Sequence, residues 1–311
     1  MYKSSGLIEQ HFHGAFGIDF MDCSVDDFVD VSVEILKYGV TRIYPTLMTG
    51  DLDTIKSQIS KIKKAKDIQP AQSAAISGIH LEGPFINTDK KGIHDESYIL
   101  EPTVENYLKI EDELIKIVTI APEKDYHYQL CHYLCQKGVK VSAGHTVAND
   151  LSACHCATHL FNAMDGISHK HKNTVTSALI DDNLYVEIIA DGNHVINDVL
   201  KLLFKTKPLD KIILISDALP DTLSDKETFV FAGQKVFLKN GSFYNAEGTL
   251  GGSGMLVSQV IKRLNECKIF ENPTTVMKMA SDNILAYLNI QNNGFVYFDD
   301  DFNIIRTELI K

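Results

Sequence analysis

The sequence predicts a single (β/α)8 barrel, in which eight parallel strands alternate with helices. Apolar strand-like runs alternate with helical patterns along most of the chain, and this alternation is typical of parallel strands joined by right-handed crossovers. The length of 311 residues suits one barrel of about 250 residues with appendages. Several apolar runs end in histidine or carboxylate residues, at the edge where barrel enzymes assemble their active sites.

The expected strands are short apolar runs separated by helical patterns. A helix is expected over residues 24–38, where Ser24 can act as an N-cap and acidic residues follow in the first turn. Another is expected over residues 52–66, where apolar residues recur at three- and four-residue spacing. The eight strands are predicted at residues 6–13, 41–47, 74–82, 115–122, 139–145, 157–162, 184–191 and 211–217.

The last part of the chain departs from this alternation. Residues 227–248 carry β-branched and aromatic residues around an Asn-Gly pair, which predicts a β-hairpin inserted after the eighth strand. We therefore expect a barrel domain over residues 1–290 and a rudimentary β appendage over residues 291–311. A late helix and two terminal strands complete the chain, at residues 280–288, 294–298 and 302–309.

Charge and composition exclude some classes of partner. The chain has 30 basic and 41 acidic residues and a net charge of −11, whereas nucleic-acid binding requires a spread basic surface. The local basic run His169-Lys170-His171-Lys172 could still neutralise one phosphate of a small ligand. The sequence has no signal-peptide pattern and no stretch of about 18 uncharged apolar residues, so we expect a cytoplasmic protein without a membrane partner.

The six cysteines lack the regular spacing of a disulfide scaffold, and we expect reduced thiols. Cys154-His155-Cys156 could suggest zinc, but a matching second pair is absent from the sequence. We interpret these residues as structural.

Histidines and carboxylates near the predicted strand ends are the candidate site. His11 and His13 flank one residue, and alternate strand residues face the same way, so both imidazoles could meet one metal ion. Taken alone, this pair could instead only shape a pocket floor. Glu82 could be a surface residue beside a turn, and Asp217 could cap the turn that follows it.

Several long strings in one order point to a known family. They are HLEGPF at 80–85, KKGIH at 90–94, THLFNAM at 158–164, IADGNHV at 189–195 and GTLGGSG at 248–254. Over residues 6–273 the chain resembles the N-acetylglucosamine-6-phosphate deacetylases of the amidohydrolase superfamily. The resemblance implies metal-dependent hydrolysis of N-acetylglucosamine 6-phosphate to glucosamine 6-phosphate and acetate.

The resemblance also implies a metal centre. Glu82, His145 and His159 would hold a catalytic divalent ion, zinc or iron, and leave one position open for water. His11 and His13 would hold a second ion bridged through Glu82. The expected cofactor is therefore one or two divalent ions per subunit.

The remaining roles follow from the same resemblance. Asp217 would act as general base and then as general acid, and His94 would help the metal polarise the acetyl carbonyl. The sugar phosphate would be bound by Ile93, Asn162, Ala163, Lys170, His194, Leu250, Gly251 and Gly252. Relatives form dimers, so a homodimer is expected.

The chain departs from the family pattern at three places. Relatives usually carry a further segment before the first barrel strand, which forms a small β-sandwich with the C-terminal strands. Only residues 147–153 remain here for a crossover helix that is longer in relatives. Relatives usually have an arginine where this chain has Lys170-His171-Lys172, and lysine lacks the bidentate fork that clamps phosphate.

These departures keep two alternatives open. One is a deacetylase of a related sugar, such as N-acetylgalactosamine 6-phosphate, because the motifs do not encode one hydroxyl configuration. The other is a catalytically impaired barrel that serves as a binding or regulatory protein.

Overall fold

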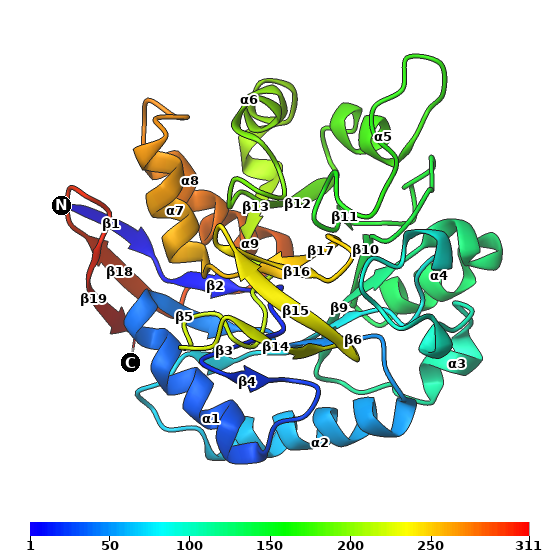
Figure 1. The fold of residues 1–311 in the computed structure, drawn as a ribbon, viewed down its shortest axis with the longest axis horizontal. Helices are drawn as coiled ribbons and strands as arrows, with labels where there is room; N and C mark the ends of the chain where they lie inside the picture. The colour runs from blue at the N-terminus through cyan, green and yellow to red at the C-terminus, as the bar shows by residue number, and fades with distance from the viewer. Residues whose placement is uncertain (311) are drawn as a thin grey trace.

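The computed structural model describes residues 1–310, and a curled parallel sheet lies at its centre (Figure 1). Seven parallel strands follow one another in the order β13-β12-β11-β10-β9-β8-β6. The arrangement is that of a mixed α/β, TIM-like barrel. The strands are β6 (Thr46–Met48), β8 (Ile79–Glu82), β9 (Ile115–Ile120), β10 (Lys140–Ala143), β11 (Cys156–Ala157), β12 (Tyr185–Ile189) and β13 (Ile212–Ile215).

A second parallel sheet contains β2 (Leu7–Glu9), β5 (Val40–Ile43) and β7 (Ala75–Ile76), in the order β2-β5-β7. The chain just after β2 joins both edges of the seven-stranded sheet. Phe12 forms a parallel bridge with Ala218 beyond β13, and its carbonyl accepts a hydrogen bond from the N–H of Thr46 in β6 at 3.0 Å.

A strand overlaps each of the eight predicted ranges, but at residues 157–162 the overlap is Ala157 alone, because β11 is Cys156–Ala157 and residues 158–162 form turns. Two other predicted strands are interrupted. Residues 41–47 divide into β5 and β6 around Pro45, which has no N–H to donate to a sheet ladder. Residues 74–82 divide into β7 and β8. The strand in the first predicted range, β2, ends at Glu9, so His11 and His13 lie beyond its regular pairing.

The helices pack around the outside of the parallel strands (Figure 1). Ser24 caps α1, where its side chain and that of Asp27 form a reciprocal capping box. The expected 24–38 helix is α1 followed by a 3₁₀ turn, Ile35–Tyr38. The helices are α1 (Val25–Glu34), α2 (Leu52–Ile68), α3 (Val104–Leu108), α4 (Gln129–Gln136), α5 (Thr174–Ile180), α6 (Asn197–Thr206), α7 (Val257–Glu266), α8 (Thr274–Met279) and α9 (Asp282–Leu288).

The prediction of a crossover helix at residues 147–153 was wrong, because this segment is a loop. The Thr146 hydroxyl accepts a hydrogen bond from the N–H of Ala148, which gives the backbone an alternative to helical bonding. The hydroxyls of Thr174 and Ser177 in α5 donate to the carbonyls of Ala148 and Asn149. The loop is therefore held by side-chain bonds to α5.

The insertion after β13 is larger than the predicted hairpin. Four antiparallel strands run in the order β14-β15-β16-β17, and β15 and β16 turn at Asn240 and Gly241, both with positive φ. The sheet lies across the carboxyl ends of the parallel strands (Figure 1). Its strands are β14 (Thr228–Phe231), β15 (Gln234–Lys239), β16 (Ser242–Asn245) and β17 (Leu250–Ser253).

The two terminal strands, β18 (Gly294–Phe298) and β19 (Ile304–Leu309), form an antiparallel sheet with β1 (Tyr2–Ser5), and residue 311 of the predicted appendage lies outside the described residues. A short pair, β3 (Gly14–Ala15) and β4 (Ile18–Asp19), completes the strands of the described chain. Within residues 1–310, no helix has the length and apolar character needed to cross a bilayer.

Candidate active site and metal centre

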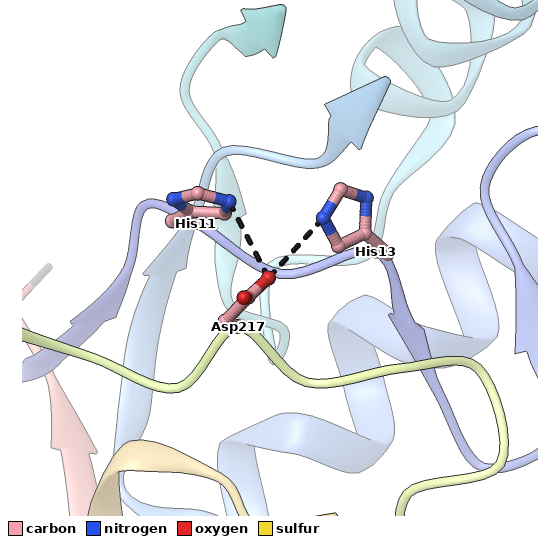
Figure 2. Close-up of side chains that lie close together, drawn as sticks. All are labelled: His11, His13 and Asp217. Atoms are coloured by element: carbon pink, nitrogen blue, oxygen red, sulfur yellow. Dashed lines mark ion pairs between the residues drawn. The ribbon is translucent and has the colours of Figure 1, made fainter. Parts of the chain in front are cut away.

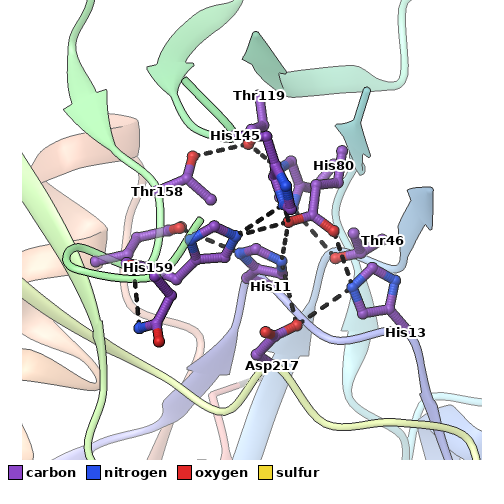
Figure 3. Close-up of polar contacts among 12 residues, drawn as sticks. His11, His13, Thr46, His80, Thr119, His145, Thr158, His159 and Asp217 are labelled. Carbon is purple, nitrogen blue, oxygen red and sulfur yellow. Dashed lines mark hydrogen bonds and ion pairs between the residues drawn. The ribbon is translucent and has the colours of Figure 1, made fainter. Parts of the chain in front are cut away.

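The candidate site lies where the carboxyl ends of the parallel strands meet. Glu82 ends β8, and His145, His159 and Asp217 each follow a strand by two residues. The side chains of His145, His159 and Asp217 converge (Figure 3). The φ angles of His145, His159 and Asp217 are 49°, 30° and 52°. Such left-handed backbone is uncommon for residues other than glycine, and it concentrates at active sites.

Glu82, His145 and His159 place three ligand atoms at the spacing that a metal ion requires. Glu82 Oε1 lies 3.2 Å from His145 Nε2 and 3.0 Å from His159 Nε2, and the two nitrogens are 3.2 Å apart. Ligands about 2.0–2.1 Å from one tetrahedral zinc ion are separated by about 3.3 Å. The three sequence-predicted residues therefore form one compact donor set.

His11, His13 and Asp217 form a second donor set beside the first (Figure 2). Asp217 Oδ1 lies 3.4 Å from His11 Nε2 and 3.2 Å from His13 Nε2. The same two nitrogens lie 3.3 Å and 3.1 Å from the Glu82 carboxylate. Glu82 is thus shared between the two donor sets, and Asp217 also lies within ligand distance of the second.

The charges of the site fit a bound cation. Burial alone would raise the pKa of Glu82 and Asp217, but the surrounding imidazoles hold the pKa of both well below the usual range. Burial opposes the charged form of His13, yet the two carboxylates raise its pKa to about 9. His11 Nε2 is buried and has no hydrogen-bond partner. Two ionised carboxylates among imidazoles are donors that suit zinc or ferrous iron.

His94 lies at the edge of the same cluster as a neutral imidazole. Its Nε2 is 3.5 Å from Glu82 Oε2, and its Nδ1 is 2.9 Å from the hydroxyl of Thr49. Burial, and then the nearby His145, lower the pKa of His94 to about 4. Glu82, His94 and His145 also form a set of possible metal ligands, so geometry alone permits His94 as a ligand.

A cavity of about 280 Å³ opens above these residues. The predicted residues Ile93, Asn162, Ala163, His194, Leu250 and Gly251 line it together with His13, Glu82, His94, His145, His159 and Asp217. Gly251 suits this position because a Cβ there would lie 2.8 Å from the Ile93 side chain. The sequence-predicted residues thus come from eight separate segments of the chain to one cavity.

Three predicted site residues do not line the cavity. His11 is fully buried beneath it. Gly252 packs behind Asp217, where a Cβ would lie 2.7 Å from the Asp217 carbonyl oxygen. Lys170 is exposed in the loop before α5.

His194 is fixed by a buried carboxylate. Asp191 Oδ2 lies 2.7 Å from His194 Nδ1 and accepts a hydrogen bond from the Ser242 hydroxyl at 2.6 Å. Burial would raise the pKa of Asp191, but these partners lower it to about 2. Because a carboxylate accepts from Nδ1, His194 presents Nε2 away from Asp191. Ser242 belongs to β16, so this contact also attaches the inserted sheet to the strand ends.

Four lining residues were not predicted from the sequence: Met48, Gly92, Phe231 and Thr249. Gly92 lies inside a motif that was recognised, so proximity to His94 could have signalled it. Phe231 comes from β14, and nothing in its local sequence indicated that the inserted sheet would cover the cavity. The Gln234 side chain donates to the carbonyl of Ile93 at 3.1 Å, which ties the inserted sheet to the His94 loop.

Comparisons with known proteins identify the family of the chain. No protein-family model matches the chain. N-acetylglucosamine-6-phosphate deacetylase of Bacillus subtilis is 31% identical, over 96% of this chain and 79% of that protein. N-acetylgalactosamine-6-phosphate deacetylase of Escherichia coli O157:H7 is 28% identical, over 84% and 71%. The crystal structure of N-acetylglucosamine-6-phosphate deacetylase from Pasteurella multocida aligns with a TM-score of 0.88 at 27% identity, over 99% of this chain and 85% of that chain. The chain belongs to the N-acetylglucosamine-6-phosphate deacetylase family.

Proposed function

We propose that the protein hydrolyses the acetamido group of N-acetylglucosamine 6-phosphate to give glucosamine 6-phosphate and acetate. The observation that carries this proposal is the pair of adjacent donor sets, joined by Glu82, at the floor of a cavity in a member of this family. The same completeness argues against an impaired barrel, because neither donor set lacks a residue.

An amide resists water because the nucleophile is weak and the amine leaves poorly unless it is protonated. A divalent zinc or iron ion, when bound, would lower the pKa of a water molecule and polarise the acetyl carbonyl group. Glu82, His145 and His159 would hold the catalytic ion. His11 and His13, with Asp217 in reach, would hold a second.

Asp217 would move the proton in this reaction. Its low pKa keeps the carboxylate ionised at neutral pH, so it can accept a proton from the attacking water. The same group would then donate this proton to the departing nitrogen. The positive φ of Asp217 suits this role, since strained backbone at strand ends is typical of catalytic positions.

His94 would stabilise the acetyl oxygen. When the Thr49 hydroxyl donates to Nδ1, the imidazole carries its proton on Nε2 and can donate it into the cavity. The pKa of about 4 keeps this imidazole neutral, so it donates a hydrogen bond and does not add a cation beside the metal.

The other cavity residues would bind the sugar phosphate. His194, Leu250, Gly251 and Ile93 would contact the sugar. Gly252, which packs behind Asp217, would continue the same loop. Asn162 and Ala163 would meet the phosphate. The Asn162 amide now donates to backbone carbonyls at 3.2 Å and 3.4 Å, bonds long enough to exchange for a phosphate oxygen.

The alternative substrate is N-acetylgalactosamine 6-phosphate, because one relative carries that name. Acetate release from both sugar phosphates decides between them. We expect the higher kcat/KM with N-acetylglucosamine 6-phosphate. A higher kcat/KM with the galactose epimer would assign the protein to the alternative, and release from neither would contradict the proposed function.

Phosphate recognition gives a separate prediction. Lys170 is exposed. Because this loop lacks the arginine that is usual in the family, the ammonium group of Lys170 is the predicted cation for the phosphate. We expect Lys170→Ala to lower kcat/KM for N-acetylglucosamine 6-phosphate roughly ten- to a hundredfold, the effect of about 1.5 to 3 kcal/mol for a charge-assisted bond. The rate with unphosphorylated N-acetylglucosamine should barely change.

Lys66→Ala, at an exposed position near the end of α2, is the matched control for that experiment. Equal losses in both lysine variants, or equal rates of the unmutated protein with both sugars, would remove Lys170 from phosphate binding.

Three finer points of the architecture are also proposals. The parallel strands form a (β/α)8 barrel over residues 1–290, with the β14–β17 sheet as an insertion after strand eight. Residues 291–311 are the remnant of a small β-sandwich. The chain forms a homodimer, which light scattering would test.

A further inference from the structure

Glu187 is a buried carboxylate that has no place in the mechanism described so far. It lies in the middle of β12, is 1% exposed and does not line the cavity. Gln10 Nε2 donates to its Oε1 at 2.6 Å, and His11 Nδ1 lies 3.2 Å from its Oε2. A buried charge is costly unless it is paired. The hydrogen bond between Glu187 and His11 therefore stabilises both buried side chains.

The contact fixes the role of each nitrogen of His11. A carboxylate oxygen accepts hydrogen bonds, so His11 Nδ1, 3.2 Å from Glu187 Oε2, is the donor in this contact. Nε2 is then the nitrogen that faces the gap between Glu82 and Asp217, where it would coordinate a cation once the ion displaces its proton. A carboxylate behind a histidine ligand holds the ring orientation and raises its basicity.

The other histidines of the site have different supports. His145 Nδ1 lies 2.8 Å from the carbonyl oxygen of Lys90, and His13 Nδ1 has no partner. The neighbouring His80 has both nitrogens occupied by the hydroxyls of Thr46 and Thr119, at 3.2 Å and 2.8 Å. Within residues 1–310, Glu187 pairs with no histidine besides His11.

We propose that Glu187 is a positioning residue that prepares His11 to bind a second divalent cation, held with His13, Asp217 and Glu82. This inference rests on the proposed function, since it concerns the same metal centre. It assigns Glu187 to the second ion alone, because the first donor set, Glu82 with His145 and His159, does not touch it.

Two variants separate the hydrogen bond from the charge. Glu187→Met keeps a similar volume and removes both. Glu187→Gln keeps the bond, because the new amide oxygen can accept from His11 Nδ1. Its NH2 can donate to Gln10 Oε1 when the Gln10 amide turns over, since Gln10 now presents Nε2 to residue 187 and its Oε1 is buried without a partner. Glu9→Gln is the matched control, since Glu9 is equally buried two residues before His11 but accepts from Val257 N–H and the Ser216 hydroxyl instead.

The measurement is metal per chain by mass spectrometry, with calorimetric zinc titration of the metal-free proteins. We expect two ions in the unmutated protein and in Glu9→Gln. Glu187→Met should bind the second ion about 10- to 100-fold more weakly and the first ion unchanged. The affinity of Glu187→Gln for the second ion should lie between those of the unmutated protein and Glu187→Met. If Glu187→Met fails to fold, the comparison of Glu187→Gln with the unmutated protein still tests the inference.

Two outcomes would overturn the inference. One is a single ion in the unmutated protein, and the other is unchanged affinity for both ions in the Glu187 variants that fold, even where the melting temperature falls. Acetate release by the unmutated protein is measured in parallel. Its absence would refute the proposed function, whereas its presence together with unchanged metal binding by the Glu187 variants would refute only the role of Glu187.

Discussion

Glu82→Gln should leave the protein folded but largely without metal, and acetate release should fall with the metal content. The Glu82 carboxylate lies within 3.5 Å of five imidazoles and belongs to both donor sets. A neutral amide is a poorer ligand and cannot balance the charge of a divalent ion. Loss of an outer-shell partner alone costs about 10- to 100-fold in metal affinity, so loss of this shared ligand should cost more.

Metal per chain and acetate release are measured together on the same preparation. Glu9→Gln provides the control for removing a buried carboxylate, and burial raises the pKa of Glu9 to about 8, so glutamine resembles its neutral form. Circular dichroism checks that both variants fold. If Glu82→Gln keeps its metal and its rate, Glu82 is not a ligand and the site assignment fails.

Asp217→Asn should separate metal content from turnover. The first donor set remains complete in this variant, so the ion held by Glu82, His145 and His159 should stay bound. Asparagine cannot accept or return the proton, and proton transfer typically contributes about 10²- to 10⁴-fold to the rate. We expect turnover to fall by that factor while at least one ion per chain remains.

Asp221→Asn is the matched control for that variant. Asp221 is also buried and lies on the same segment, but its carboxylate accepts from Ser224 and does not line the cavity. Turnover by Asp217→Asn at the unmutated rate would remove Asp217 from proton transfer. Loss of all metal in that variant would instead make Asp217 chiefly a ligand, which its 3.4 Å and 3.2 Å distances to His11 and His13 allow.

The regular elements could be predicted from the sequence because their signals are local. Apolar runs mark most of the parallel strands, and the Ser24 cap marks the start of α1. Residues 157–162 are an exception, because only Ala157 of that run is in a strand. The segment at residues 147–153 could not be predicted, because hydroxyls from α5, more than twenty residues away, hold it as a loop. The inserted sheet was underestimated for a similar reason. Its Asn-Gly turn is local, whereas the pairing of β17 with β16 is set by the tertiary structure.

The residues of the candidate site could be predicted where they lie inside a recognisable sequence motif. Glu82, His94, His159 and His194 all lie in such strings, and the structure brings them to one cavity. Glu187 was missed because a single glutamate between apolar strand residues has the same appearance as an exposed position. Only the fold places it behind His11, so no local pattern could have signalled it.

The most direct test of the account is acetate release from N-acetylglucosamine 6-phosphate by the same protein sample before metal removal, after chelation, and after reloading with zinc or ferrous iron. If the protein is a metal-dependent deacetylase, acetate and glucosamine 6-phosphate are released in equal amounts, the activity is lost on chelation, and it recovers with at least one of the two ions. Hydrolysis that persists in the metal-free protein, or no hydrolysis with either ion restored, would contradict the proposed function.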